Sequence, residues 1–343
     1  IVTVGLTATL PRTEPGLYAL VAMAILARVL WSGIVTLRPT IWRANYPRAA
    51  RARMVGKFST VQVLVIAAAG ALLGKALEFN EHAYRVLVPL ACVVGAGAVW
   101  FFAGVRVRGR RAMLAEEQRL ASSGKPWQGP GIVWRVLRKD PWFARFQTCM
   151  FILGVSNLML APVLVISLRD QFGLGYLGVL ITSTIPYVTM VLAIPLWARL
   201  LDRAHVVKFR SIHSWAFVVS TTVILIASMT HRVELMYVGA VLQGLAFGGG
   251  TLAWNLGHTD FAPPSQTSEY MAAHVTLNGV RGLLAPFVAV LGIYQPALAM
   301  GATPGQAMSL VCAVTLALAV AGAVGFVLLR RQMGAMLAQV RRG

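Results

Sequence analysis

Ionisable and polar side chains inside long apolar stretches are the residues of this chain with the clearest capacity for chemistry. His274, Asn278 and Arg281 are spaced i, i+4 and i+7, so a helix would present all three on one face. Arg28 lies in the middle of another apolar stretch. Two central guanidinium groups would attract an anion through charge and paired hydrogen bonds. For each arginine, the alternative is a structural pairing with a backbone carbonyl or with a carboxylate elsewhere.

Neutral polar residues within the apolar stretches could also line a solute path. They are Gln147, Asn157, Thr182, Ser183, Thr184, Tyr187, Trp31, Gln243 and Asn255. Each is also explained by a hydrogen bond between helices. His274 is a candidate proton carrier, because histidine titrates near neutral pH. A hydrogen-bonded, buried histidine is the more ordinary interpretation of the same residue.

The sequence lacks the usual patterns of metal, cofactor or hydrolytic chemistry. His258, Asp260 and Glu269 lie near one another, but their spacing matches no ligand motif, and helix capping by the two acids explains them better. The three cysteines lie singly in apolar runs. Neither Gly-x-Ser-x-Gly nor His-x-x-x-His occurs. We therefore expect no metal, no cofactor and no enzymatic activity.

The composition points to a membrane environment. Of the 343 residues, 57% are apolar and 12% are charged, against about 25% charged residues in an ordinary soluble domain. A soluble chain of this length could not bury so much apolar surface. The net charge of +20 would suggest nucleic acid in a soluble protein. Here the basic residues lie between apolar runs, so we interpret them as determinants of membrane orientation and expect no nucleic-acid partner.

Nine apolar runs are long enough to cross a bilayer, and each must be helical because lipid offers the backbone no hydrogen-bond partner. They cover residues 16–40, 55–77, 84–105, 143–167, 174–200, 210–230, 233–256, 269–293 and 305–329. Residues 1–10 fit the tail of a further span. Four prolines are expected to bend or break three of these helices, namely Pro162, Pro186, Pro195 and Pro286.

The connectors between the runs alternate between basic and nearly neutral, which predicts that the C-terminus is cytoplasmic. The connector between residues 256 and 269 is the exception, since it has neither lysine nor arginine. We divide the chain into a partial N-terminal bundle, a cytoplasmic interdomain linker, a C-terminal six-helix bundle and a cytoplasmic tail. Their bounds are 1–105, 106–142, 143–330 and 331–343.

An internal repeat supports this division. At an offset of 215, Thr36-Leu37 corresponds to Thr251-Leu252, and Tyr46 corresponds to Phe261. A parallel repeat on the two sides of a long linker is typical of secondary transporters built from two bundles.

The connector after residue 200 carries the first of four resemblances to the major facilitator superfamily. Ala198–Arg203, followed by Lys208 and Arg210, is similar to the family's Gly-x-x-x-Asp-Arg-x-Gly-Arg-Arg loop motif in its second-half copy. Ala198 and His205 stand where glycines are usual, so the match is degenerate.

The other three resemblances lie in or beside apolar runs. Arg28 followed by Ser32-Gly33 resembles the basic motif of the family's fourth helix. Gly279–Gly292 looks like the glycine/proline motif of the fifth helix, transposed to the equivalent eleventh. The last is the turn at Arg43–Pro47.

The resemblance implies an all-α protein of two bundles, in which the nine runs are helices four to twelve and two to three helices precede Ile1. It also implies that Asp202, with Arg199 and Arg203, latches the bundles together in an outward-facing state. The alternative is a solvated basic loop in which Asp202 is a local counter-charge. Trp31, Asn157 and Gln243 would belong to cavity-lining helices.

We therefore expect a secondary active transporter that moves a small organic solute by alternating access. We expect a monomer in the inner (plasma) membrane of a bacterium, with the solute and the lipid bilayer as its partners. Proton coupling and an anionic substrate are hypotheses that the residues raise without deciding. A lipophilic-drug efflux carrier and a non-transporting membrane scaffold on the same fold are the alternatives.

Overall fold

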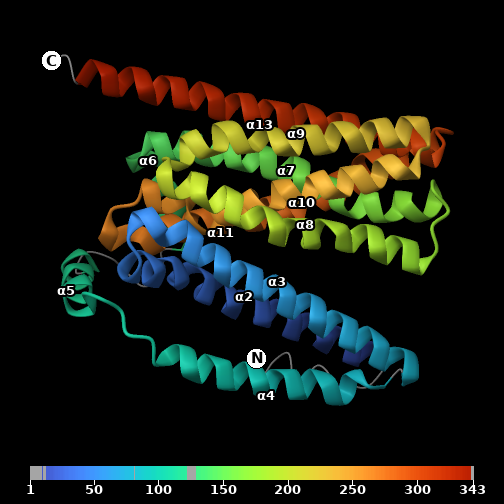
Figure 1. Ribbon diagram of the computed structural model, residues 1–343. Coiled ribbons are helices and arrows are strands. Elements are labelled where there is room, and N and C mark those ends of the chain that lie inside the picture. Colours follow the sequence, from blue (N-terminus) through green and yellow to red (C-terminus); the bar gives the residue numbers. More distant parts are fainter. Residues whose placement is uncertain (1–9, 11–12, 81, 122–128, 341–343) are drawn as a thin grey trace.

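The computed structural model describes residues 10, 13–80, 82–121 and 129–340. This part of the chain is almost entirely helical and contains no strand. Nine of its helices are long and apolar enough to cross a membrane. The predicted all-α architecture and its nine spans are therefore confirmed (Figure 1). The predicted tail of a further span, residues 1–10, falls almost wholly outside the described residues.

Helices α2 (Glu14–Asn45), α3 (Arg48–Phe79) and α4 (Tyr84–Ala103) form the first group. The α2 helix begins where the Thr13 hydroxyl accepts a hydrogen bond from the Gly16 amide at 3.3 Å. It ends at Tyr46, whose backbone is extended because Pro47 follows. Around this turn both helices run past the predicted spans. The apolar pattern marks the segment that faces lipid, whereas the Tyr46-Pro47 turn is what stops the helix.

The segment between the two groups contains α5 (Arg110–Ala121) and α6 (Gly129–Lys139). The α6 helix packs against α11 and leads directly into the second group. Two tryptophans near this segment differ in exposure, since Trp134 of α6 is exposed and Trp142 of α7 is partly buried. Trp127 lies outside the described residues.

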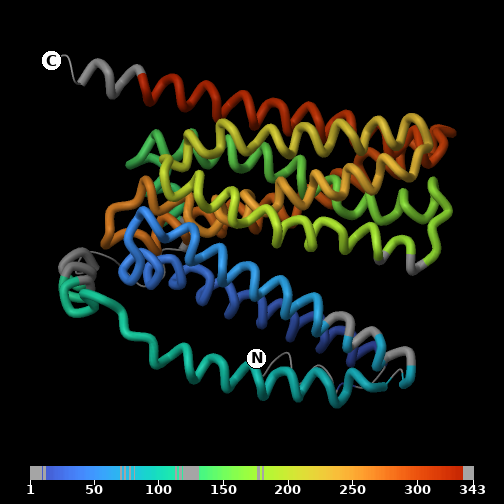
Figure 2. The backbone as a smooth tube through the Cα atoms, in the orientation of Figure 1, coloured from blue at the N-terminus to red at the C-terminus, as the bar shows by residue number. Residues whose placement is uncertain are grey.

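The second group begins with α7 (Pro141–Asp170), α8 (Tyr176–Arg203), α9 (Val206–Thr230) and α10 (Val233–Leu256). The short 3-10 turns η1 (Gly257–Asp260) and η2 (Pro264–Gln266) connect α10 to α11 (Thr267–Ala289). A π-helical turn η3 (Val290–Tyr294) and α12 (Gln295–Ala299) precede α13 (Pro304–Val340). The α13 helix packs along α7 and α9, and α10 packs along α8 and α9 (Figure 2).

The prolines do not break the helices in which they lie. The α7 helix continues through Pro162, and α8 continues through both Pro186 and Pro195. After Pro286 the α-helical pattern changes to the π-helical turn η3, so the backbone stays helical with a different hydrogen-bond register. Residues 331–340, predicted as part of a tail, continue α13 as a helix.

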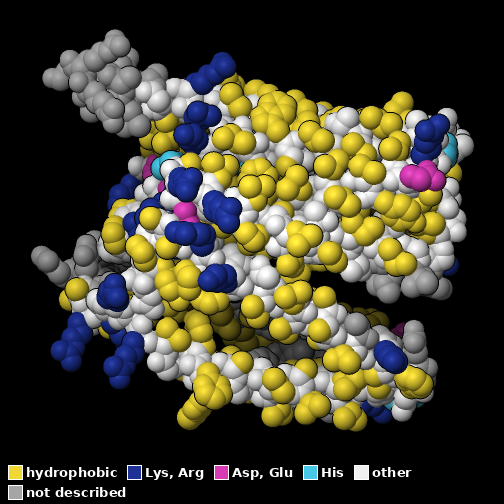
Figure 3. Space-filling view, in the orientation of Figure 1, with side chains coloured by type: hydrophobic (Ala, Val, Ile, Leu, Met, Phe, Trp, Pro, Cys, Tyr) yellow, Lys and Arg dark blue, Asp and Glu magenta, His cyan; other side chains and the backbone are white. Residues whose placement is uncertain are grey.

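The two groups of helices meet at one end of the molecule and diverge toward the other (Figure 1). The end where they meet carries the α2–α3, α8–α9 and α10–α11 connections, and lysine and arginine side chains gather on it (Figure 3). We call it the basic end. The outer faces of the helices carry many exposed large apolar side chains, as contact with lipid requires.

Candidate functional site

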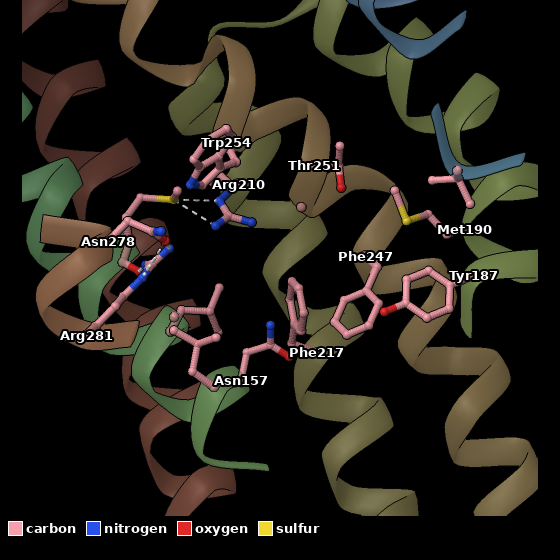
Figure 4. A pocket seen from close by; sticks show the side chains of 16 residues that line it. Asn157, Tyr187, Met190, Arg210, Phe217, Phe247, Thr251, Trp254, Asn278 and Arg281 are labelled. Carbon is pink, nitrogen blue, oxygen red and sulfur yellow. Dashed lines mark hydrogen bonds between the residues drawn. The ribbon is translucent and has the colours of Figure 1, made fainter. Parts of the chain in front are cut away.

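A cavity of ≈ 370 Å³ lies among the helices of the second group, with α3 contributing one residue of its wall. Its lining combines two arginines, two asparagines and several aromatic side chains (Figure 4). The residues labelled in Figure 4 are Asn157, Tyr187, Met190, Arg210, Phe217, Phe247, Thr251, Trp254, Asn278 and Arg281. The lining residues that the structure describes include no aspartate or glutamate.

Arg281 lies in this cavity, close to α7. Its Nε and Nη2 atoms donate to the side-chain oxygen of Asn278 at 3.1 and 2.6 Å, and its Nη1 atom donates to the backbone oxygen of Met150. Gly154 of α7 leaves the space that the guanidinium group occupies, because a Cβ atom at this position would overlap it. The predicted face that carries Asn278 and Arg281 therefore does point into a cavity.

Arg210, which the sequence pattern assigned to a connector, lines the cavity. It lies in α9 and is only 4% exposed. Its Nη2 and Nε atoms donate to the sulfur of Met150 at 2.7 and 3.2 Å, and Nη1 lies 3.1 Å from Nδ1 of His213. The α9 helix begins at Val206, four residues before the predicted span, because the His205 side chain caps it. The sequence did contain a signal that Arg210 belongs to the helix, since His213 and Phe217 continue its helical face.

His213 supports Arg210 from a closely packed site. Its Nε2 atom lies 2.8 Å from the backbone oxygen of Ala246. The ring stacks on Phe209 and meets Trp197 edge-on, with centroid distances of 5.1 and 4.8 Å. Gly249 gives the ring its space on α10, because a Cβ atom there would overlap the imidazole. The position of Arg210 therefore depends on a glycine in a neighbouring helix.

Replacing Gly249 by alanine is expected to destabilise the protein. The imidazole is held on several sides, so it cannot move away from a new methyl group without disturbing its neighbours, and overpacking of this kind costs about 1–3 kcal/mol. Thermal unfolding in detergent would measure the effect. Gly282→Ala is the matched control, because nothing lies within 4 Å of a Cβ atom at that position. Equal melting temperatures for the two variants would contradict the prediction.

The other predicted path residues divide between the cavity and other locations. Asn157 lines the cavity. Gln243 is buried in α10 but is not part of the lining. Arg28 and Trp31 are exposed on α2. Arg28 and Arg281, which the sequence suggested as a pair of central cations, are therefore not brought together, and the second arginine of the cavity lining is Arg210.

His274 lies beside the cavity and not in its lining. It is 3% exposed, and its Nδ1 atom lies 3.0 Å from the side-chain oxygen of Gln147. Its ring meets Trp254 at a centroid distance of 5.6 Å. This is the environment of a hydrogen-bonded, buried histidine, the more ordinary of the two interpretations of this residue.

Asp202 connects the two groups of helices at the basic end. Its carboxylate accepts hydrogen bonds from the backbone amides of Ala52 and Arg53 at 2.7 and 3.2 Å, and from Nε of Arg53 at 3.0 Å. Arg199 and Arg203 are exposed beside it. Asp202 therefore contacts the first turns of α3, whose positive end attracts its carboxylate, and a role of this contact as a latch stays a prediction.

Asp260 makes a second connection at the same end. Its carboxylate pairs with Nε of Arg48 at 2.9 Å and accepts a hydrogen bond from the Val206 amide at 2.8 Å. The expected helix capping by Asp260 is therefore found at the start of α9, a helix distant in sequence. Glu269 lies in the first turn of α11. Within the described residues, His, Cys, Asp and Glu form no group that could hold a metal ion.

The comparisons with known proteins agree with this architecture. The model of the family described as Major Facilitator Superfamily matches residues 1–286. No curated protein matches the chain significantly. The family match covers most of the sequence, including α10 and most of α11, which contribute to the cavity wall. With its transmembrane helices and its central cavity, the chain belongs to the Major Facilitator Superfamily, a family of secondary transporters.

Proposed function

We propose that this protein carries a small organic anion across the membrane by alternating access. The observation that supports the anion is the pair of buried guanidinium groups in the cavity wall. Arg210 and Arg281 are 4% and 8% exposed. No carboxylate among the described lining residues neutralises them. Because burying a charge without a counter-charge is costly, a bound anion would stabilise this arrangement.

Alternating access is supported by the contrast between the two ends of the molecule. At the basic end, Asp202 and Asp260 connect the second group of helices to α3. Toward the other end the two groups diverge (Figure 1). With the orientation predicted from the basic connectors, the basic end faces the cytoplasm, and this state is outward-facing.

We assign no transported proton to His274. The described contacts of this histidine are with Gln147 and Trp254, neither of which is a carboxylate. A charged imidazole there would be buried without a counter-charge and would lie on the same helix face as Arg281. Uptake driven by a pH gradient and lost in His274→Gln would overturn this part of the proposal.

Neutralising Arg281 tests the proposed function. Arg281→Gln is expected to reduce anion uptake into proteoliposomes by about tenfold or more, because hydrogen bonds to a charged partner are worth about 1.5–3 kcal/mol. Arg28→Gln is the matched control, since Arg28 is exposed on α2 and does not line the cavity. Unchanged uptake in Arg281→Gln would favour a lipophilic-drug carrier. If no added solute raised the melting temperature of the protein, a non-transporting scaffold would be favoured.

A further inference from the structure

We propose that the anion is an amphipathic aromatic carboxylate, whose carboxylate group replaces the Met150 thioether on Arg210 and whose ring rests against the aromatic wall of the cavity. This inference rests on the proposed function and specifies its substrate class.

The cavity has two chemically different sides. Arg281 and Asn278 lie together on one side, with Arg210 between them and the far wall (Figure 4). The opposite side is built from the rings of Phe217, Phe247 and Tyr187 (Figure 4). A small hydrophilic anion such as phosphate would leave these rings without a partner. A ligand with one charged end and one flat apolar end would contact both sides.

Met150 marks where the carboxylate would bind. The side-chain sulfur of Met150 accepts from two nitrogens of Arg210, and its backbone oxygen accepts from Arg281. The two arginines, from α9 and α11, therefore converge on one residue of α7. A thioether is a weak acceptor, whereas a carboxylate forms strong paired hydrogen bonds with a guanidinium group. An incoming carboxylate would accordingly displace the sulfur from Arg210, and the unbranched methionine side chain can adopt another rotamer.

The size of the cavity limits the ligand. Its volume of ≈ 370 Å³ is near the lower end of the range of about 300–1,000 Å³ for small-molecule sites. One ring with a short acidic group fits this space better than an extended or fused-ring compound.

Binding of three probes to the purified chain in lipid nanodiscs would test the inference. Benzoate carries both features, acetate carries only the charge, and benzyl alcohol carries only the ring. We expect benzoate to bind about tenfold or more tightly than either of the others, since each side of the cavity contributes separately. Acetate binding as tightly as benzoate would overturn the aromatic inference and leave the anion transporter standing. Benzyl alcohol binding as tightly as benzoate would overturn both the aromatic-carboxylate inference and the proposed anion transport. Failure of benzoate to bind would overturn the aromatic-carboxylate inference.

Two variants locate the probe. Phe247→Leu is expected to weaken benzoate about three- to tenfold while leaving acetate unchanged. Phe287→Leu is its control, because Phe287 is 58% exposed on α11 and outside the lining. Met150→Leu keeps the volume but removes the competing sulfur, so it is expected to tighten benzoate severalfold. Weaker benzoate binding in Met150→Leu, or equal effects of the two phenylalanine variants, would contradict the assigned binding mode.

Discussion

Replacing Gly154 by alanine is expected to remove most anion binding while leaving the stability of the protein nearly unchanged. The new Cβ atom would occupy the place of the Arg281 guanidinium group, the flexible far end of a long side chain. Arg281 would swing out of its position and lose its hydrogen bonds to Asn278 and Met150. The helix itself would tolerate the change, because alanine is favoured over glycine in helices by about 1 kcal/mol.

The loss of a positioned guanidinium group should weaken anion binding by about tenfold or more. Benzoate affinity in nanodiscs, measured together with the melting temperature, would separate loss of the site from loss of the fold. Gly279→Ala is the matched control, because a Cβ atom at this position of α11 has no neighbour within 4 Å. Wild-type affinity in Gly154→Ala would show that Arg281 does not act from its observed position.

The second large effect is expected from Asp202→Asn, which should open the basic end. The carboxylate faces two backbone amides and one guanidinium group, all of which are donors. An asparagine would turn its NH2 group toward at least one of them. Hydrogen bonds to a charged group are worth about 1.5–3 kcal/mol. If this contact exists in one transport state only, its loss would shift the ratio of states by roughly ten- to a hundredfold.

Most of this effect should come from the start of α3 and not from the Arg53 side chain. The side chain of Arg53 is 58% exposed, whereas the side chain of Asp202 is 3% exposed. An exposed partner contributes little, so Arg53→Gln is expected to have a much smaller effect than Asp202→Asn. Asp170→Asn removes an exposed carboxylate at the C-terminal end of α7, far from the basic end, and is expected to leave the ratio of states unchanged.

Distances between spin labels at exposed Lys57 of α3 and Lys208 of α9 would report the opening. The labels would be attached to Lys57→Cys and Lys208→Cys in a background without Cys92, Cys149 and Cys312. We expect Asp202→Asn to increase the population with long distances. A distance distribution identical to that of wild type would contradict a role of Asp202 in holding the two groups together.

Several features were determined by the sequence alone. The apolar runs established nine helices, because a chain in lipid must satisfy its backbone hydrogen bonds within each segment. The spacing of Asn278 and Arg281 placed both on one face, and both line the cavity. These are local properties, which depend on helical periodicity and on the order of residues along a single segment.

Only the tertiary structure decided which polar residues share the cavity. Arg281 lies 131 residues from Met150 in sequence, and Arg210 lies 60 residues from it. No periodic pattern links residues so distant. Their convergence depends on how α7, α9 and α11 pack, and on Gly154 and Gly249, whose missing side chains admit Arg281 and His213. Arg28 has the same chemistry as Arg281 and a similar apolar setting, yet it lies exposed on α2 and does not line the cavity.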